Sequence, residues 1–122
     1  MNRRTTGGCL CGSVRYEIEG PLPPASACHC ERCRRWQGAL GIYSLAPSDR
    51  YKIKGQRHLA WYESSPGIRR GFCRVCGSKL FWERMGSGQL DVTLGSMDPP
   101  VGLKIEKQIK TEDAGDYYDP PP

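Results

Sequence analysis

Cysteines give this chain its strongest chemical signal. Seven of them occur among 122 residues, and they fall into three tight groups. The groups are Cys9 and Cys11, then Cys28, Cys30 and Cys33, then Cys73 and Cys76. Pairs spaced C-x-C and C-x-x-C rarely close into unstrained disulfides outside redox enzymes, and they are typical of metal sites. We therefore interpret these cysteines as metal ligands.

The start of the chain supports reduced thiols. It reads MNRRTTGGCLC and contains no apolar segment of the kind that a secretory signal requires. No run anywhere approaches the ~18 apolar residues that cross a membrane. We therefore expect a cytoplasmic protein, in which thiols stay reduced and disulfides are rare.

The grouping of two, three and two predicts two different zinc sites. A structural zinc ion is normally held by four Cys or His ligands from two short loops that lie far apart in sequence. The outer groups supply four such ligands: Cys9, Cys11, Cys73 and Cys76. The middle group supplies only three: Cys28, Cys30 and Cys33. Three thiolates leave one coordination position free, which is the arrangement of a zinc ion that binds water or substrate.

Length and composition limit the fold that positions these ligands. A chain of 122 residues makes a single domain, 1–122, and its 15 glycines and 10 prolines disfavour long helices. We predict a mainly β, compact, zinc-bearing fold of short antiparallel strands with at most one or two short helical turns. The final segment, about 116–122, is expected to be a loose tail.

Alternating apolar residues predict where the strands lie. Val14, Tyr16 and Ile18 alternate with charged residues, which is the period of a strand with one buried face. Six further strands are predicted at 40–45, 51–53, 59–63, 68–72, 80–84 and 90–94. Residues 31–37 are predicted to form the short helix, ended by Gly38, and 25–29 are interpreted as a link before it.

The histidines and tryptophans are assigned no catalytic role. His29 lies between two cysteines of a C-x-C turn, where side chains alternate in direction, so we expect its ring to point away from the metal. His58 is expected to be at the surface or partly buried. Neither histidine has an Asp or Ser partner that would predict a hydrolytic triad. Three tryptophans are expected in the core or in a pocket wall: Trp36, Trp61 and Trp82.

The charge distribution favours acidic partners. All 18 Lys and Arg residues precede residue 111 together with nine of the 13 acidic residues, so the body carries +9 and the tail −4. An acidic small molecule fits this field, and nucleic acid is an alternative partner through two arginine groups: Arg32, Arg34 and Arg35, and Arg69, Arg70 and Arg74. Nucleic acid is the less favoured partner, because no recognition-helix or RNA-stacking motif is present. A protein-interaction module without catalysis is a further alternative.

Four segments carry a family resemblance across most of the chain. They are 7–16 (GGCLCGSVRY), 28–35 (CHCERCRR), 70–77 (RGFCRVCG) and 95–99 (GSMDP), in that order. With these motifs the chain resembles the short members of the glutathione-dependent formaldehyde-activating family, also called the centromere protein V or GFA domain. It departs from many relatives at Lys104, where the Leu103-Lys104-Ile105 stretch replaces a His-Ile pair.

The resemblance implies a fold, ligand sets and an activity. It implies a compact β-fold with a structural zinc ion on Cys9, Cys11, Cys73 and Cys76. It also implies a catalytic zinc ion on Cys28, Cys30 and Cys33. The implied activity is that of a carbon–sulfur lyase that joins glutathione and formaldehyde, or separates them again. A small thiol such as glutathione is accordingly the expected substrate.

Overall fold

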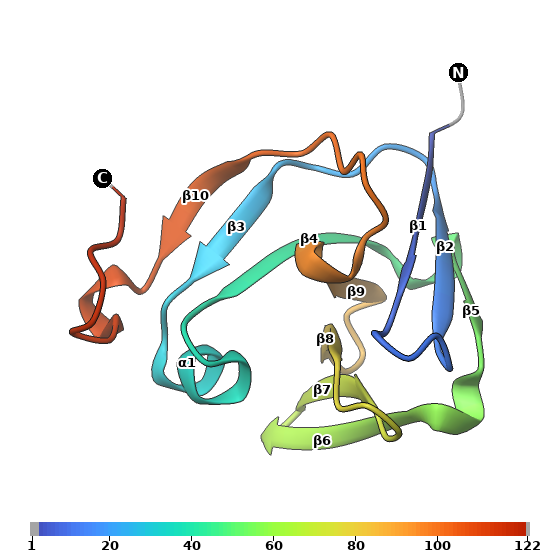
Figure 1. Cartoon of the computed structure of the whole chain (residues 1–122), viewed down its shortest axis with the longest axis horizontal. Coiled ribbons are helices and arrows are strands. Elements are labelled where there is room, and N and C mark those ends of the chain that lie inside the picture. The colour runs from blue at the N-terminus through green and yellow to red at the C-terminus, as the bar shows by residue number, and fades with distance from the viewer. Residues whose placement is uncertain (1–2, 122) are drawn as a thin grey trace.

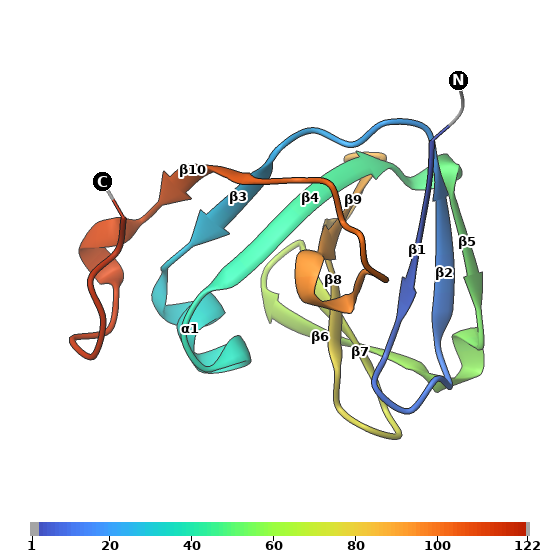
Figure 2. The ribbon, with the colours of Figure 1, turned by 45° about the horizontal axis from the view of Figure 1, so that its top comes forward.

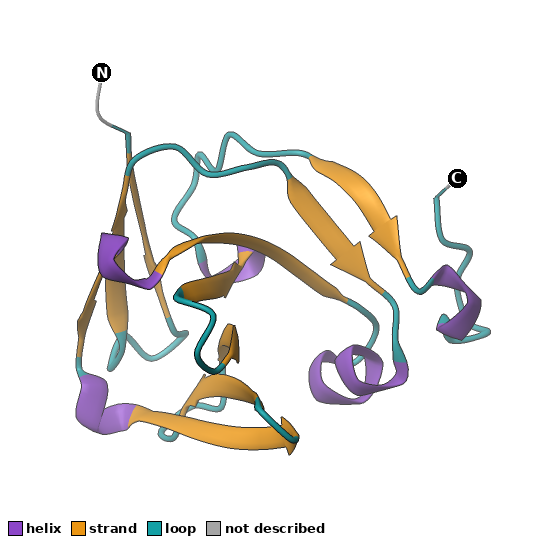
Figure 3. Ribbon diagram, turned by 180° about the vertical axis from the view of Figure 1, so that it is seen from behind, coloured by secondary structure: helices purple, strands orange, loops and turns teal. Residues whose placement is uncertain are grey.

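The computed structural model describes residues 3–121, and strands make up most of its regular structure (Figure 3). The strands are β1 (Arg4–Gly8), β2 (Arg15–Glu19), β3 (Ala25–Cys28), β4 (Gly41–Pro47), β5 (Tyr51–Lys54), β6 (Leu59–Ser65), β7 (Ile68–Cys73), β8 (Lys79–Arg84), β9 (Gln89–Thr93) and β10 (Ile105–Ile109). The α-helix is α1 (Glu31–Gln37), and the short 3₁₀ turns are η1 (Ser48–Arg50), η2 (Gln56–His58), η3 (Leu94–Ser96) and η4 (Thr111–Asp113). The predicted fold class is confirmed.

Two sheets form the body. A three-stranded sheet has the order β1-β2-β5, and a seven-stranded sheet has the order β10-β3-β4-β9-β8-β7-β6. Figure 1 shows the small sheet standing at one end of the molecule, with β3 and β10 at the other end. In Figure 2 the long strand β4 runs between these two ends. Neighbouring strands pair antiparallel, except that β10 lies parallel to β3.

All seven predicted strands are present, but three further strands escaped prediction. The segment 25–29, interpreted as a link, contains β3, which pairs with both β4 and β10. Its sequence ASAC has no bulky alternation, so only the pairing partners reveal it. β1 was missed because its sequence RTTGG ends in two glycines. At Gly7 a side chain would collide with the Tyr16 ring, so the close approach of β1 to β2 requires glycine there.

The hydrophobic core lies between the two sheets. Tyr16 and Ile18 of β2 are buried from one side, and Phe81 and Val92 of the large sheet are buried from the other. The Tyr16 and Phe81 rings meet edge to face with their centroids 5.5 Å apart. This packing leaves the opposite face of the large sheet free to line a cavity.

Helix α1 matches its prediction at both ends. The Cys30 sulfur caps its N-terminus, and Gly38 ends it with a φ of 101° and an N–H that donates to the Arg34 carbonyl over 2.7 Å. Trp36 fixes the helix against the β6–β7 hairpin. Its ring stacks on Tyr62 at 5.9 Å between centroids and meets Phe72 edge-on at 5.5 Å.

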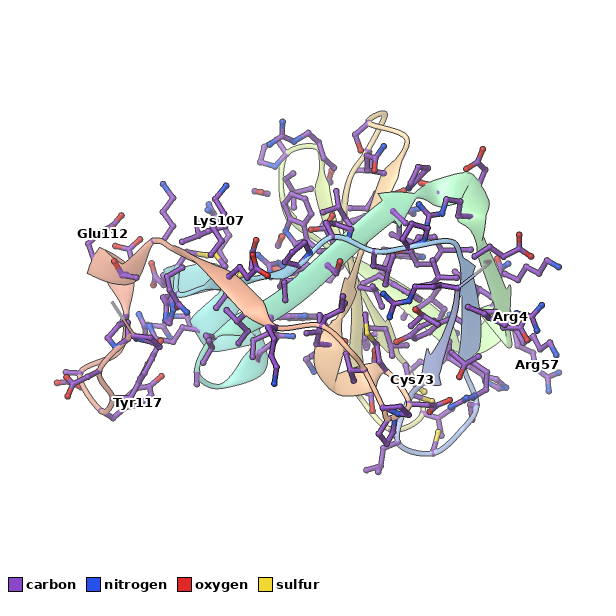
Figure 4. The ribbon with its side chains drawn as sticks, turned by 90° about the horizontal axis from the view of Figure 1, so that it is seen from above. Arg4, Arg57, Cys73, Lys107, Glu112 and Tyr117 are labelled. Atoms are coloured by element: carbon purple, nitrogen blue, oxygen red, sulfur yellow. The ribbon has the colours of Figure 1, made fainter. Side chains whose placement is uncertain are left out.

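The C-terminal segment lies at the end of the molecule away from Arg4 and Arg57, as the labelled Glu112 and Tyr117 show (Figure 4). The Tyr117 hydroxyl donates to the Gly38 carbonyl over 3.1 Å. A loose tail over 116–122 remains a prediction about motion, and its last residue, 122, lies outside the described residues. At the start of β10, the exposed Lys104 accepts a hydrogen bond at its carbonyl from the Ala25 N–H, 2.9 Å away.

Candidate functional site

The first cysteine cluster joins two loops that are distant in sequence. Its four sulfurs come from the β1–β2 connection, the end of β7 and the β7–β8 connection, and all lie within 4.8 Å of one another: Cys9, Cys11, Cys73 and Cys76. The Cys9 and Cys11 sulfurs are 3.7 Å apart, and the Cys11 and Cys73 sulfurs are 3.8 Å apart. A tetrahedron of sulfurs at 2.3 Å from zinc has edges of about 3.8 Å. The cluster therefore has the dimensions of a four-thiolate zinc site.

The loops around this cluster direct polar hydrogens at its sulfurs. The Val14 N–H donates to the Cys9 sulfur over 3.2 Å, and the Val75 N–H donates to the Cys73 sulfur over 3.4 Å. Gly12 and Gly77 lie within the two loops, each directly after a cysteine pair and each with a φ of 82°, which allows the tight turns. These amides offset part of the negative charge of thiolates, as a zinc site requires.

The thiols of this cluster differ in their readiness to ionise. The Ser78 hydroxyl, 3.1 Å from the Cys76 sulfur, lowers the pKa of Cys76 to about 5. Burial raises the pKa of Cys73 to about 11. A buried thiol beside three others ionises only when a cation compensates the charge. The donor set thus fits a bound divalent metal.

The second cluster surrounds the start of α1. Cys28 ends β3, Cys30 caps the helix and Cys33 lies in its first turn, with the three sulfurs within 4.8 Å of one another. The Cys33 N–H donates to the Cys30 sulfur over 3.4 Å. The structure therefore brings together the three cysteines that the sequence grouped, in a set that can also hold a metal ion.

A buried arginine serves this second cluster. The Arg70 side chain reaches from β7, where the residue is only 3% exposed, and its Nη1 donates to the Cys33 sulfur over 3.6 Å. Its Nε donates to the Ser64 hydroxyl over 3.1 Å, which fixes the guanidinium. A hydrogen bond from the Cys33 thiol, assisted by the charge of Arg70, lowers the pKa of Cys28 to about 5. The sequence interpretation gave Arg70 a possible phosphate contact and missed this role, because it depends on how β7 lies against α1.

His29 does not face the metal ligands. It is fully buried, its Nε2 lies 2.6 Å from the Gln108 Oε1, and its Nδ1 bonds the Tyr118 hydroxyl. Both ring nitrogens are thus engaged by the C-terminal segment. An Nε2–H that donates to Gln108 leaves Nδ1 to accept from the tyrosine. His58 is half-buried and contacts Arg57, with its Nε2 3.1 Å from the arginine Nε.

A cavity of about 520 Å³ opens beside the three-cysteine cluster. The three sulfur-bearing residues line it together with four cations and one carboxylate: Arg32, Arg70, Arg84, Lys110 and Asp91. Trp82 also lines it, as expected for a pocket wall. The face of the large sheet opposite the core forms much of this cavity. The cavity can therefore hold an anionic small molecule against the three-cysteine cluster.

A second cavity of about 470 Å³ lies beside the four-cysteine cluster. Its polar walls include Gln37, Ser78 and Lys79. The Lys79 ammonium is already engaged, since it donates to the Gly77 carbonyl over 2.8 Å and lies 4.8 Å above the Trp36 ring. Of these two cavities, the one of about 520 Å³ is lined by the three-cysteine cluster.

Several arginines of the alternative nucleic-acid surface are occupied elsewhere. Arg69 donates to Glu83 over 2.6 Å and lies 3.9 Å from the centre of the Trp61 ring. Arg35 pairs with Glu31 over 3.0 Å on the surface of α1. Arg70 is also buried. Neither arginine group is therefore wholly available to contact phosphates.

Comparisons with known proteins agree with this arrangement. Residues 4–113 match the sequence model of the family described as glutathione-dependent formaldehyde-activating enzyme. The chain belongs to this family. It is 25% identical over 114 residues to an uncharacterized lyase of Schizosaccharomyces pombe, covering 93% of this chain and 82% of that protein.

A solved structure shares the fold. The crystal structure of a Rhodobacter sphaeroides protein superimposes with a TM-score of 0.68 at 26% identity, covering 86% of this chain and 99% of that one. None of the helices among residues 3–121 has the length and apolar character that a membrane crossing requires.

Proposed function

We propose that the protein is a zinc-dependent carbon–sulfur lyase that acts on a thiol adduct such as S-hydroxymethylglutathione. The observation that carries this proposal is the three-cysteine cluster at the edge of a cation-lined cavity, in a chain that also contains a separate four-cysteine cluster. The family description and the lyase name of the yeast relative support the reaction class.

The reaction needs neither oxidant nor reductant. In synthesis, a thiol sulfur forms a bond to the carbonyl carbon of formaldehyde. The electron pair of the carbon–oxygen π bond moves to the oxygen and forms a bond to the thiol proton, which gives a hydroxyl group. Lysis reverses each change. Cys28, Cys30 and Cys33 would hold a zinc ion, which would supply a mild Lewis acid for the reaction.

The protein's own residues hold and orient the reactants. Arg70 places a fixed positive charge against the Cys33 sulfur, which would offset part of the negative charge of the thiolates that hold the metal. Arg32 and Lys110 line the same cavity near the cluster and attract the carboxylates of a peptide thiol. Confinement in a cavity of about 520 Å³ converts an encounter in solution into a reaction between held partners.

Exchange spectroscopy tests this function directly. Zinc-loaded protein should accelerate the exchange of ¹³C label between formaldehyde and S-hydroxymethylglutathione above the rate in buffer. The variant Cys30→Ser should return the exchange to the buffer rate. No acceleration by zinc-loaded protein, with glutathione or with another thiol, would reject the proposed activity.

A further inference from the structure

Two opposite charges, Asp91 and Arg84, line the cavity on neighbouring strands. Asp91 of β9 is directly opposite Trp82 of β8, and Arg84 lies two residues beyond Trp82 on the same strand. Residues two apart on a strand point to the same face, and diagonal neighbours lie about 7–8 Å apart. Both residues line the cavity that the three cysteines line. A single molecule in that cavity can therefore contact both charges.

Neither charge has an ion-pair partner in the described part of the chain. The ion pairs among residues 3–121 are Arg15–Asp98, Arg35–Glu31 and Arg69–Glu83. The side-chain hydrogen bonds of this part of the chain likewise leave the Asp91 carboxylate unpartnered, while burial raises its pKa to about 7. A carboxylate removed from water without a donor lacks stabilisation that a ligand cation would provide.

The position of this pair relative to the cluster sets a length for the ligand. Cys28 is opposite Gly41 of β4, whereas Asp91 is opposite Leu45, four residues farther along that strand. Four residues of a strand span about 13 Å. A ligand that reaches both the cluster and Asp91 must therefore be extended, longer than free cysteine.

A row of side chains across the sheet connects Asp91 with the three-cysteine cluster. Asp91, Trp82 and Arg70 face one another on β9, β8 and β7, so Asp91 and Arg70 are two strand spacings apart, about 10 Å. The Arg70 guanidinium contacts the cluster at Cys33. Between the two charges, Trp82 offers a flat apolar surface that suits a short methylene chain.

We propose that Asp91 and Arg84 bind the α-amino-carboxylate end of an extended thiol substrate, such as the γ-glutamyl residue of a glutathione-type peptide. The ligand ammonium lies on Asp91 and its carboxylate on Arg84, while the sulfur lies at the three-cysteine cluster. This assignment rests on the proposed function for the identity of the reacting end. A thiol whose far end carries only phosphate would meet repulsion from Asp91 and is disfavoured.

Calorimetric binding of S-methylglutathione to zinc-loaded protein tests this subsite without any turnover, because the capped sulfur cannot react. N-acetylation of the γ-glutamyl ammonium should weaken binding roughly ten- to a hundredfold, the range for a hydrogen bond to a charged group. Asp91→Asn should weaken the binding of S-methylglutathione by a similar factor and leave the binding of the N-acetylated ligand almost unchanged. The matched control Asp49→Asn, an exposed residue outside the cavity, should change neither.

The outcomes separate this inference from the proposed function. Equal binding of the two ligands by the wild-type protein, or an equal loss of both in Asp91→Asn, would overturn the subsite. The ligand comparison needs only the wild-type chain, so it stands even if the variant folds poorly. Discrimination without ¹³C exchange would keep the subsite and reject the lyase activity, whereas exchange without discrimination would do the reverse.

Discussion

Arg70 shows how one residue can serve a metal site without being a ligand. Its guanidinium is almost completely buried and is held between the Ser64 hydroxyl and the Cys33 sulfur. A buried charge is stable only with a partner, and the Cys33 sulfur would be that partner when it binds a metal as a thiolate. The cation and the three sulfurs therefore stabilise one another.

We expect Arg70→Met to weaken zinc at the three-cysteine cluster by about tenfold or more, because a loss on the order of 1.4 kcal/mol changes an equilibrium constant tenfold. Competition with a chromophoric chelator measures this affinity. The zinc affinity of Arg70→Lys should lie between those of Arg70→Met and the wild type, since lysine keeps the charge but loses the two-point contact. The exposed Arg74 of the other cluster provides the control variant Arg74→Met. Wild-type affinity in Arg70→Met would contradict the role.

The two cysteine clusters join different kinds of elements. The four-cysteine cluster joins two loops across the core, and Cys73 within it is fully buried. The three-cysteine cluster joins only the end of β3 to the start of α1. Loss of the first should therefore disturb the whole fold, and loss of the second should have a local effect.

The variants Cys73→Ser and Cys30→Ser should accordingly differ. Cys73→Ser should leave the protein insoluble or unfolded, because metal binding at such a site is coupled to folding. Cys30→Ser should fold, since serine is itself a favoured helix cap, and should lose only exchange activity. Circular dichroism and the exchange assay distinguish the two. Equal loss of folding would show that both clusters are structural.

Strand β9 carries a carboxylate whose burial has a measurable consequence for stability. The folded pKa of Asp91 is about 7, above the ordinary value of 3.8. A group with a raised folded pKa favours the folded state below its unfolded pKa, and this contribution is lost as the pH rises through the folded pKa. The loss of folding stability caused by ionising the buried Asp91 therefore develops between about pH 4 and pH 7. Tyr43 faces the same cavity, and burial raises the pKa of its hydroxyl above the ordinary value, so this group stays neutral across the range.

The free energy of unfolding of Asp91→Asn should therefore equal that of the wild type at pH 4 and exceed it above pH 7. The expected gain is about 1–2 kcal/mol, allowing for the partial solvent access of the carboxylate. Urea unfolding of zinc-saturated protein at several pH values provides the measurement. A difference that is constant with pH would show that the carboxylate does not titrate in this range.

At the scale of the whole molecule, the acidic C-terminal segment is separated from the four-cysteine cluster. The acidic tail residue Glu112 lies at the end of the structure near Tyr117, away from Cys73 of the four-cysteine cluster (Figure 4). Four cations line the cavity beside the three-cysteine cluster, with one carboxylate among them. The basic body can thus attract an anionic thiol while the tail remains outside the cavity.

Elemental analysis of protein purified without chelator should give close to two zinc ions per chain. Cys30→Ser should retain about one, held by the closed four-thiolate set, because three-thiolate coordination is lost. Inductively coupled plasma mass spectrometry against protein concentration gives the ratio. A value near zero for the wild type would contradict both metal sites.

The sequence by itself determined the local features of this protein. The spacing within each cysteine group, the alternation of Tyr16 and Ile18, and the helix that Gly38 ends are all encoded over a few residues. Such signals need no knowledge of the fold, because ligand geometry, strand period and helix caps are short-range properties. They also carried the family resemblance, since its motifs are runs of neighbouring residues.

Only the tertiary structure decided the contacts between distant segments. It placed β3 between β4 and β10, Arg70 against Cys33, and Asp91 opposite Trp82. These relations depend on which strands pair and in what register, and a shift of one residue would turn each side chain to the other face. Register is fixed by the packing of the whole core, so no short stretch of sequence encodes it. The cysteines could therefore be grouped in advance, whereas the cavity beside three of them could not be predicted.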